Sequence, residues 1–402
     1  MMTASTVSAT SATNHPPAAD DGRALSSDYG LTVHAVLPPP VTGMTVCTQS
    51  VANAVARRVC VRRFNWSNGA PKITSWFRIV KAMRALITPG RLLFDRRPRH
   101  GVFYMPANAG MAVMFNLLAL GAARLRGYRC VLHHHYYRYV DQFEWRIKLV
   151  TNMLGPSDLQ IVLCSEMERR FRSLYGQSLP LAVVPSTIQL LEGETPPASH
   201  TRELDHVTTP FCLGHISNLQ LAKGLDLVLD VFRELRRRQL DVRLVLAGPI
   251  DTVVERRMIE AAQAEFGQRL DYRGPVYDEA KRRFFQDIHV NIYPTRLDAQ
   301  PLVIAETFAC ARPVISFSRG CIPGLMPTAD WCVPVADDFV AAAVEQVVRW
   351  IDDRQAYGTA CQLARRKYDE LLVEASDALD KFVRWVCCEP VDGFVRRGPA
   401  QG

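Results

Sequence analysis

The stretch from Tyr293 to Glu306 constrains the fold of this chain more than any other. It follows an apolar run, residues 288–292, that predicts a buried strand, and it leads into a predicted helix over 301–309. Pro301 suits the first turn of that helix, where its missing N–H is harmless. A strand that enters a helix through a short polar turn is where an open α/β sheet collects ligands, and the helix N-terminus favours phosphate.

Two acids lie in this stretch, Asp298 in the turn and Glu306 eight residues later. Together with the strand predicted at 314–317, the pair resembles the E-x7-E motif of the GT-B-fold retaining glycosyltransferases of the family-4 type. The resemblance implies that Asp298 serves the donor sugar and Glu306 the nucleotide ribose. Asp298 is one methylene shorter than the family's glutamate. On the residues alone, Asp298 could instead cap the helix and Glu306 could be a solvated surface residue.

The resemblance implies an α/β fold of the GT-B kind, in which two doubly wound Rossmann-like domains face each other across a cleft. The alternation of short apolar runs with helical segments agrees with this class. We expect a disordered N-terminal extension over 1–29, because that segment is rich in Ser, Thr, Ala and Pro. The remaining divisions are an acceptor-side domain at 30–207, a nucleotide-sugar domain at 208–388 whose last helix crosses back, and a tail at 389–402 that we also expect to be disordered.

Lys223 opens a long amphipathic helix soon after the strand predicted near residue 211, which positions a point charge for phosphate. Most family members carry Gly-Arg where this chain has Ser217-Asn218, so one cation is missing, and His215 or Arg296 could compensate. By resemblance, the catalytic residues are Lys223, Asp298 and Glu306. The residues expected to bind the donor are Ser217, Asn218, Lys223, Gly248, Val276, Leu302, Val303 and Glu306.

The expected acceptor side comprises two loops of the first domain. Gly43 and Met44 follow a Pro-rich loop, and His133, His134 and His135 follow a strand predicted at 129–132. Both loops resemble acceptor loops of the family, although an ordinary β–α turn and locally bonded histidines are the alternatives. Consecutive histidines alternate in direction and cannot all ligate one metal without a sharp bend. We therefore expect no metal and no other cofactor beyond the nucleotide-sugar substrate.

The eleven cysteines are scattered and contain no CxxC pair, which predicts reduced thiols in a cytoplasmic protein rather than disulfides or a zinc site. No apolar run reaches the roughly 20 residues of a membrane span. No secretory signal is apparent at the N-terminus.

The segment from Arg57 to Arg99 holds twelve basic residues and one acid. Within it, residues 74–87 predict an amphipathic helix with Trp76, Val80, Met83 and Ile87 on one face. Such a helix can lie on an anionic membrane at the inner face, or pack its apolar side on its own domain. Nucleic acid is not an expected partner, because no recognised motif or stacking platform accompanies the charge.

The resemblance implies metal-independent transfer of a sugar, with retention, from a nucleotide sugar to a glycan or lipid-linked acceptor. The Pro-Pro-Pro loop and the three histidines most resemble transferases of bacterial polysaccharide assembly, which implies a role in cell-surface polysaccharide biosynthesis. The alternative is a catalytically silent GT-B scaffold that binds a glycan or membrane partner. The departures at Asp298 and Asn218 favour that alternative, and donor hydrolysis would distinguish the two.

Overall fold

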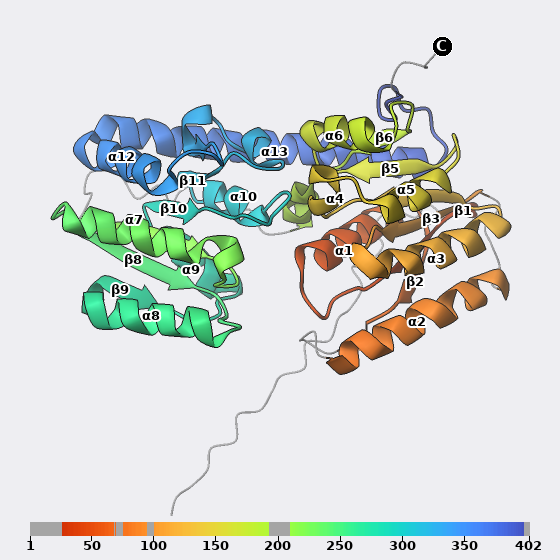
Figure 1. Cartoon of the computed structure of the whole chain (residues 1–402). Coiled ribbons are helices and arrows are strands. Elements are labelled where there is room, and N and C mark those ends of the chain that lie inside the picture. Colours follow the sequence, from red (N-terminus) through yellow and green to blue (C-terminus); the bar gives the residue numbers. More distant parts are fainter. Residues whose placement is uncertain (1–25, 68, 70–74, 95–99, 193–209, 398–402) are drawn as a thin grey trace, which may run out of the picture.

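The computed structural model describes residues 26–67, 69, 75–94, 100–192 and 210–397. They form two α/β domains, each built on a six-stranded parallel sheet (Figure 1). The first sheet has the order β2-β1-β3-β4-β5-β6 and the second the order β12-β11-β10-β7-β8-β9. The predicted class, two doubly wound Rossmann-like domains, is confirmed.

The first domain alternates strands and helices along the chain. Its strands are β1 Ser26–Ala35, β2 Val59–Asn65, β3 His100–Pro106, β4 Arg129–His133, β5 Leu159–Val162 and β6 Leu181–Val183. Its helices are α1 Gly43–Ala56, α2 Ser75–Phe94, α3 Val113–Leu125, α4 Arg138–Asp141, α5 Trp145–Asn152 and α6 Ser165–Tyr175, followed by the 3-10 segment η2 Ser186–Glu192.

The second domain repeats the pattern. Its strands are β7 Phe211–Ile216, β8 Val242–Ala247, β9 Leu270–Tyr272, β10 Val290–Tyr293, β11 Val314–Phe317 and β12 Cys332–Val333. Its helices are α7 Leu225–Arg237, α8 Val253–Phe266, α9 Asp278–Asp287, α10 Leu302–Ala309, α11 Ile322–Leu325 and α12 Phe339–Asp352, and the chain continues into α13 Arg354–Val386.

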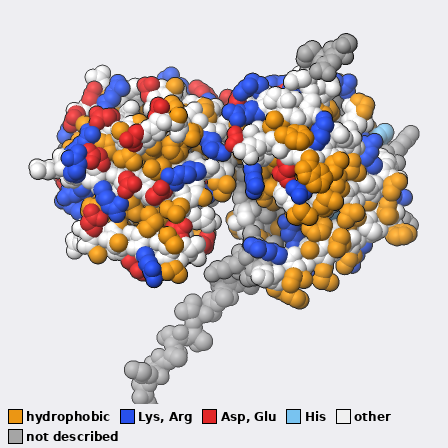
Figure 2. Space-filling model, viewed as in Figure 1, with side chains coloured by type: hydrophobic (Ala, Val, Ile, Leu, Met, Phe, Trp, Pro, Cys, Tyr) orange, Lys and Arg blue, Asp and Glu red, His pale blue; other side chains and the backbone are white. Residues whose placement is uncertain are grey.

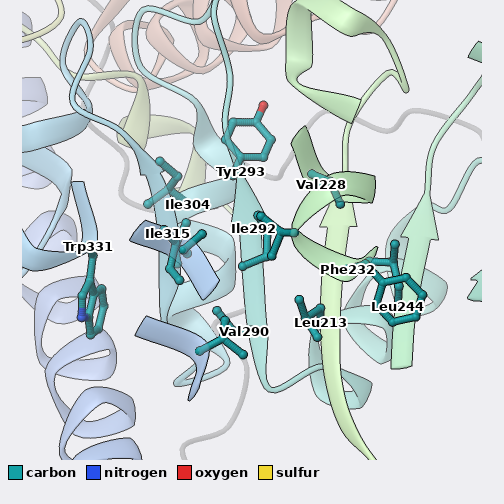
Figure 3. Close-up of a cluster of buried hydrophobic side chains, with 14 of the residues drawn as sticks. Leu213, Val228, Phe232, Leu244, Val290, Ile292, Tyr293, Ile304, Ile315 and Trp331 are labelled. Carbon is teal, nitrogen blue, oxygen red and sulfur yellow. The ribbon is translucent and has the colours of Figure 1, made fainter. Parts of the chain in front are cut away.

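The core of the second domain explains why its strands are nearly continuous apolar runs. All four residues of β10 are buried, since helices cover both faces of a parallel sheet. In Figure 3, Leu213, Ile292 and Ile315 of neighbouring strands line up beneath side chains of the flanking helices. Tyr293 ends β10, and its hydroxyl points away from this cluster toward the loops at the carboxyl end of the sheet. The core thus fixes the strand end from which the candidate site begins.

Helix α13 joins the two domains. Its first half, including Tyr357 and Cys361, packs in the core of the second domain. Its second half, including Phe382 and Val386, packs in the core of the first. The helix is continuous over 33 residues, so one rigid element ties the two sheets together.

Two sequence-based expectations at the chain ends need correction. Strand β1 begins at Ser26, so residues 26–29 are not part of a disordered extension, and Tyr29 stacks on His100 with ring centroids 4.9 Å apart. Residues 389–397 also pack on the first domain, where Phe394 is buried and Arg396 forms an isolated antiparallel β-bridge with Leu181. The rest of the predicted extension and tail, 1–25 and 398–402, lies outside the described residues.

Candidate functional site

The candidate site begins at the junction of β10 and α10. Pro301 stands at the N-cap of α10 with φ −74° and ψ 121°, one position before the first turn in which the sequence analysis placed it. Leu302 and Val303 then open the helix, both half-buried. Their N–H groups belong to the first turn, where backbone donors have no partner within the helix.

Asp298 is held by three side chains. Its Oδ2 accepts hydrogen bonds of 2.8 Å from both the Tyr293 and the Thr295 hydroxyl. Its Oδ1 pairs with the ammonium group of Lys223. Burial, reinforced by the Asp298 carboxylate, raises the pKa of Tyr293 well above its usual value, so the phenol stays protonated and donates. Asp298 is therefore part of a charged network and not a helix cap.

Glu306 makes a separate ion pair one turn into α10. Its Oε1 accepts a 2.6 Å hydrogen bond from Nζ of Lys281, which lies on α9. Each of the two predicted carboxylates is thus neutralised by a lysine from another element. The alternative of a solvated Glu306 is excluded by this contact and by its half-buried position.

Gly224 brings Lys223 to Asp298. It has φ +83°, and a Cβ at this position would lie 2.4 Å from the carbonyl oxygen of Pro294 in the loop after β10. Only glycine tolerates both the left-handed backbone and the close approach. The short 3-10 turn that ends at Lys223 can therefore sit directly against the Asp298 loop.

Gly248 similarly allows the loops after β7 and β8 to touch. Its φ is +132°, and a Cβ would lie 1.7 Å from the Ser217 carbonyl oxygen. Asn218 is exposed beside Ser217, and Val276 packs on the apolar cluster at the ends of these strands. The structure thus groups these predicted donor residues at the carboxyl end of the second sheet.

Neither suggested substitute for the missing arginine is available. His215 is fully buried, its Nδ1 lies 2.8 Å from the Ile292 carbonyl oxygen, and burial lowers its pKa to about 4, which leaves it neutral. Arg296 donates two hydrogen bonds, of 2.8 and 2.9 Å, to Asp226. Lys223 and Lys281 are instead the lysines that contact the two carboxylates, and of these only Lys223 was predicted.

The first domain meets this site through a short set of contacts. Gln300, two residues after Asp298, accepts a 2.6 Å hydrogen bond from the Ser186 N–H and donates to the Leu163 carbonyl oxygen at 3.1 Å. Leu163 and Ser186 follow β5 and β6, so the carboxyl ends of the two sheets face each other.

A disulfide between Cys164 and Cys321 lies in the same junction, with Cα atoms 5.8 Å apart. The expectation that all cysteines are reduced is wrong for this pair. No local pattern indicates this bond, because the two residues are separated by 157 positions and meet only where the loops after β5 and β11 come together.

The predicted acceptor residues lie in the first domain. Gly43 is exposed at the start of α1, and Met44 is half-buried beside it. His134 is buried and its two ring nitrogens lie 3.1 Å from the Tyr139 hydroxyl and the Gln160 side-chain oxygen. His133 is also fully buried, whereas His135 is half-buried. Of the three histidines, His135 is the most exposed to a ligand.

Sequence reasoning missed three residues of this network. Tyr293 and Thr295 precede the acid by five and three residues, so two hydroxyl side chains just before Asp298 were a usable signal. Lys281 had none, because its contact with Glu306 depends on the packing of α9 beside α10.

Residues 210–353 match the family model described as glycosyl transferases group 1. A curated relative, the phosphatidylinositol N-acetylglucosaminyltransferase gpi3 subunit of Schizosaccharomyces pombe, is 21% identical over 282 residues. That match covers 66% of this chain and 58% of the yeast protein's length.

Solved GT-B structures superpose on nearly the whole chain. Sucrose-phosphate synthase from Thermosynechococcus elongatus matches with a TM-score of 0.66 at 14% identity, covering 90% of this chain and 99% of that one. Anabaena Alr3699/HepE in complex with UDP-glucose matches with a TM-score of 0.63 at 13% identity, covering 88% and 99%. The fold is therefore GT-B, and together with the family model these similarities support a glycosyltransferase.

Proposed function

We propose that this protein is a retaining hexosyltransferase of the family-4 type that moves a sugar from a nucleotide-sugar donor to a glycan or lipid-linked acceptor. The observation that carries the proposal is the network in which Lys223 and Tyr293 hold Asp298 at the start of α10. It stands at the carboxyl end of the sheet, opposite the first domain, where open α/β folds bind nucleotides.

Each group of the network has a role in this chemistry. The Lys223 ammonium, with the Leu302 and Val303 N–H groups, neutralises the departing diphosphate, an electrostatic stabilisation of the leaving group. Asp298 accepts hydrogen bonds from the donor sugar, and Glu306 from the ribose. Donor binding requires Lys223 and Lys281 to exchange or share their carboxylate partners, so the ligand-free pairs are a resting state.

The donor is proposed to be a UDP-sugar, because the HepE relative was solved with UDP-glucose. A thermal-shift screen of nucleotide sugars selects the donor, and release of nucleoside diphosphate then measures turnover. We expect Asp298→Ala and Glu306→Ala to lose most of the turnover, while Glu374→Gln, an exposed acid on α13, retains it. A folded protein that neither binds nor hydrolyses any nucleotide sugar would establish the silent scaffold instead.

Lys223 and the helix-end N–H groups supply the charge that a divalent ion would otherwise supply at the diphosphate. We therefore propose that transfer needs no metal at the donor site. Addition of Mg²⁺ or Mn²⁺ should leave the rate unchanged, and a strict requirement for either ion would contradict this assignment.

A surface of the first domain supports a membrane-bound acceptor. Helices α2 and α3 lie side by side, and Figure 2 shows apolar side chains gathered on this domain. On α2, Trp76 is 64% exposed and Met83 and Ile87 are more than half exposed, whereas Ala85 and Leu92 face the domain core. Three of the four residues of the predicted apolar face are therefore exposed, and the fourth, Val80, is half-buried. Other exposed apolar residues of this surface are Ile79, Leu86, Met114, Leu118 and Leu125.

We propose that this surface places the enzyme on an anionic membrane, at its cytoplasmic face, where a lipid-linked acceptor of cell-surface polysaccharide biosynthesis would be found. Exposed Arg78 and Arg91 add attraction to anionic headgroups, about 1 kcal/mol each. No helix within the described residues has the length and hydropathy needed to cross a bilayer. The yeast relative is named for a phosphatidylinositol substrate, which supports a lipid acceptor.

Liposome sedimentation tests the membrane surface. Trp76→Ser combined with Met83→Ser should release the protein from anionic vesicles, while Val253→Ser with Val254→Ser, two exposed apolar residues of α8, should not. Failure of the wild type to sediment at low salt would remove the membrane proposal and leave sugar transfer untouched.

A further inference from the structure

A cluster of potential metal ligands lies in the first domain, apart from the donor network. It consists of Cys47 on α1, His133 at the end of β4 and His135 two residues later. The ligating atoms of the three residues all lie within 4.8 Å of one another. His134 points to the opposite side of the strand, so the alternation expected from the sequence holds. It separates one histidine from the cluster and leaves the other two on the same side.

Two ring nitrogens of this cluster lack a hydrogen bond of good geometry. Nε2 of His133 and Nε2 of His135 are both buried without one among the described residues, although the Val184 backbone lies near the His133 ring. An unsatisfied buried polar group destabilises the folded state, and native structures contain few. Two such atoms side by side, next to a buried thiol, suggest a ligand that accepts their lone pairs.

Tyr104 orients one of the imidazoles. Its hydroxyl lies 2.6 Å from Nδ1 of His133, and the tyrosine is fully buried. When Nδ1–H donates to the tyrosine oxygen, the lone pair is left on Nε2, which faces the cluster. Metal-bound histidines almost always have such a partner on the other ring nitrogen.

The other roles open to a cysteine–histidine group do not fit. Cys47 is fully buried in the apolar core between α1 and the sheet, so no substrate reaches its sulfur. The nearest groups are the two imidazoles, whose centroids are 4.1 Å apart, and not a second cysteine that could form a disulfide.

We propose that Cys47, His133 and His135 bind a transition-metal ion of the Zn²⁺ class that fastens the start of α1 to the end of β4. One thiolate and two imidazoles are ligands that Zn²⁺ favours, whereas Mg²⁺ and Ca²⁺ require oxygen. The site is structural, and it is independent of the proposed sugar transfer.

Metal binding tests the proposal directly. The full-length protein, freed of metal by a chelator and dialysed, is titrated with Co²⁺ and then with Zn²⁺. We expect one ion per chain, a visible d–d spectrum of a tetrahedral site with a thiolate charge-transfer band, displacement by Zn²⁺, and a higher melting temperature with Zn²⁺ than without.

Three variants decide the ligands. Cys47→Ser should abolish the charge-transfer band, while Cys130→Ser, an equally buried cysteine on β4, should keep it. Tyr104→Phe should retain the spectrum but weaken Zn²⁺ binding about 10- to 100-fold. His135→Ala, at a half-buried position after the strand, serves if Cys47→Ser does not fold. A wild type that binds no stoichiometric Co²⁺, or a His135→Ala variant that binds it unchanged, would overturn the proposal.

Discussion

We expect substitution of Lys223 and substitution of Asp298 to have opposite effects on the binding of a diphosphate. In the ligand-free protein the two side chains are 17% and 21% exposed, so their contact is partly open to solvent. A diphosphate must take the ammonium group from Asp298 or share it. Substituting Lys223 removes a contact to phosphate, whereas substituting Asp298 removes a competitor for that contact.

The magnitudes follow from these contacts. A hydrogen bond to a charged group contributes about 1.5–3 kcal/mol, so Lys223→Met should weaken UDP binding roughly 10- to 100-fold. Asp298→Asn keeps the shape of the side chain and leaves the Tyr293 and Thr295 hydroxyls in place, but it removes the ion pair with Lys223. Because a partly exposed pair is worth about 0–1 kcal/mol, UDP affinity should stay equal or rise up to about fivefold. Turnover should nevertheless fall, since the carboxylate is assigned to the sugar.

Isothermal titration calorimetry with UDP measures both effects. Lys381→Met, which removes an exposed lysine paired with Asp377 on α13, is the matched control and should bind as the wild type does. Unchanged affinity in Lys223→Met would refute the phosphate role of that lysine. Equal weakening in both site variants would show that Asp298 positions Lys223 and does not compete for it.

Three further predictions concern the frame around the site. Gly224→Ala should lower the free energy of unfolding by at least about 1–2 kcal/mol in urea titrations and also weaken UDP binding, because its Cβ would strike Pro294 at a positive φ. Without reductant, Cys164→Ser should lower the free energy of unfolding by about 2–5 kcal/mol, to the value of the wild type treated with dithiothreitol. Equal stability of the untreated wild type and the variant would argue against the disulfide. His215 has a folded pKa of about 4 against an ordinary 6.5, so the unfolded state takes up its proton first. The contribution of neutral His215 to the free energy of unfolding is complete above pH 6.5 and falls by about 3 kcal/mol as the pH drops to 4. This loss should be absent when the pH dependence of unfolding is measured for His215→Asn.

The sequence was sufficient for elements whose pattern is local. The apolar run before Tyr293, the polar turn and the proline predicted the strand–turn–helix unit, and β10 and α10 form it. Strand β2 was not predicted, because its two arginines interrupt the apolar pattern. In the structure its residues are only partly covered, and their exposure roughly alternates along the strand. Local periodicity identifies such a strand only when one face is clearly apolar.

The amphipathic helix shows a second limit of the sequence. Helical spacing correctly places Trp76, Met83 and Ile87 together, but it does not reveal which face the domain covers. In the structure Ala85, Thr88, Pro89 and Leu92 are buried, whereas Trp76, Met83 and Ile87 remain exposed. Burial depends on how α2 lies on its neighbours, and that is fixed by packing between elements distant in the sequence.

The short acid at position 298 was, with Asn218, one of the two departures that favoured a silent scaffold, and the structure shows what surrounds this acid. A carboxylate on a shorter side chain reaches less far, so it functions only if its surroundings bring it to the ligand. Tyr293 at the end of a buried strand, Thr295 in the turn and Lys223 across the loop all converge on this one carboxylate. Because Gly224 lets that loop approach, the groups that hold this carboxylate come from two loops that the sequence separates by some 70 residues. A departure from a motif is therefore evidence of lost function only when such supporting contacts are also missing, and here they are present.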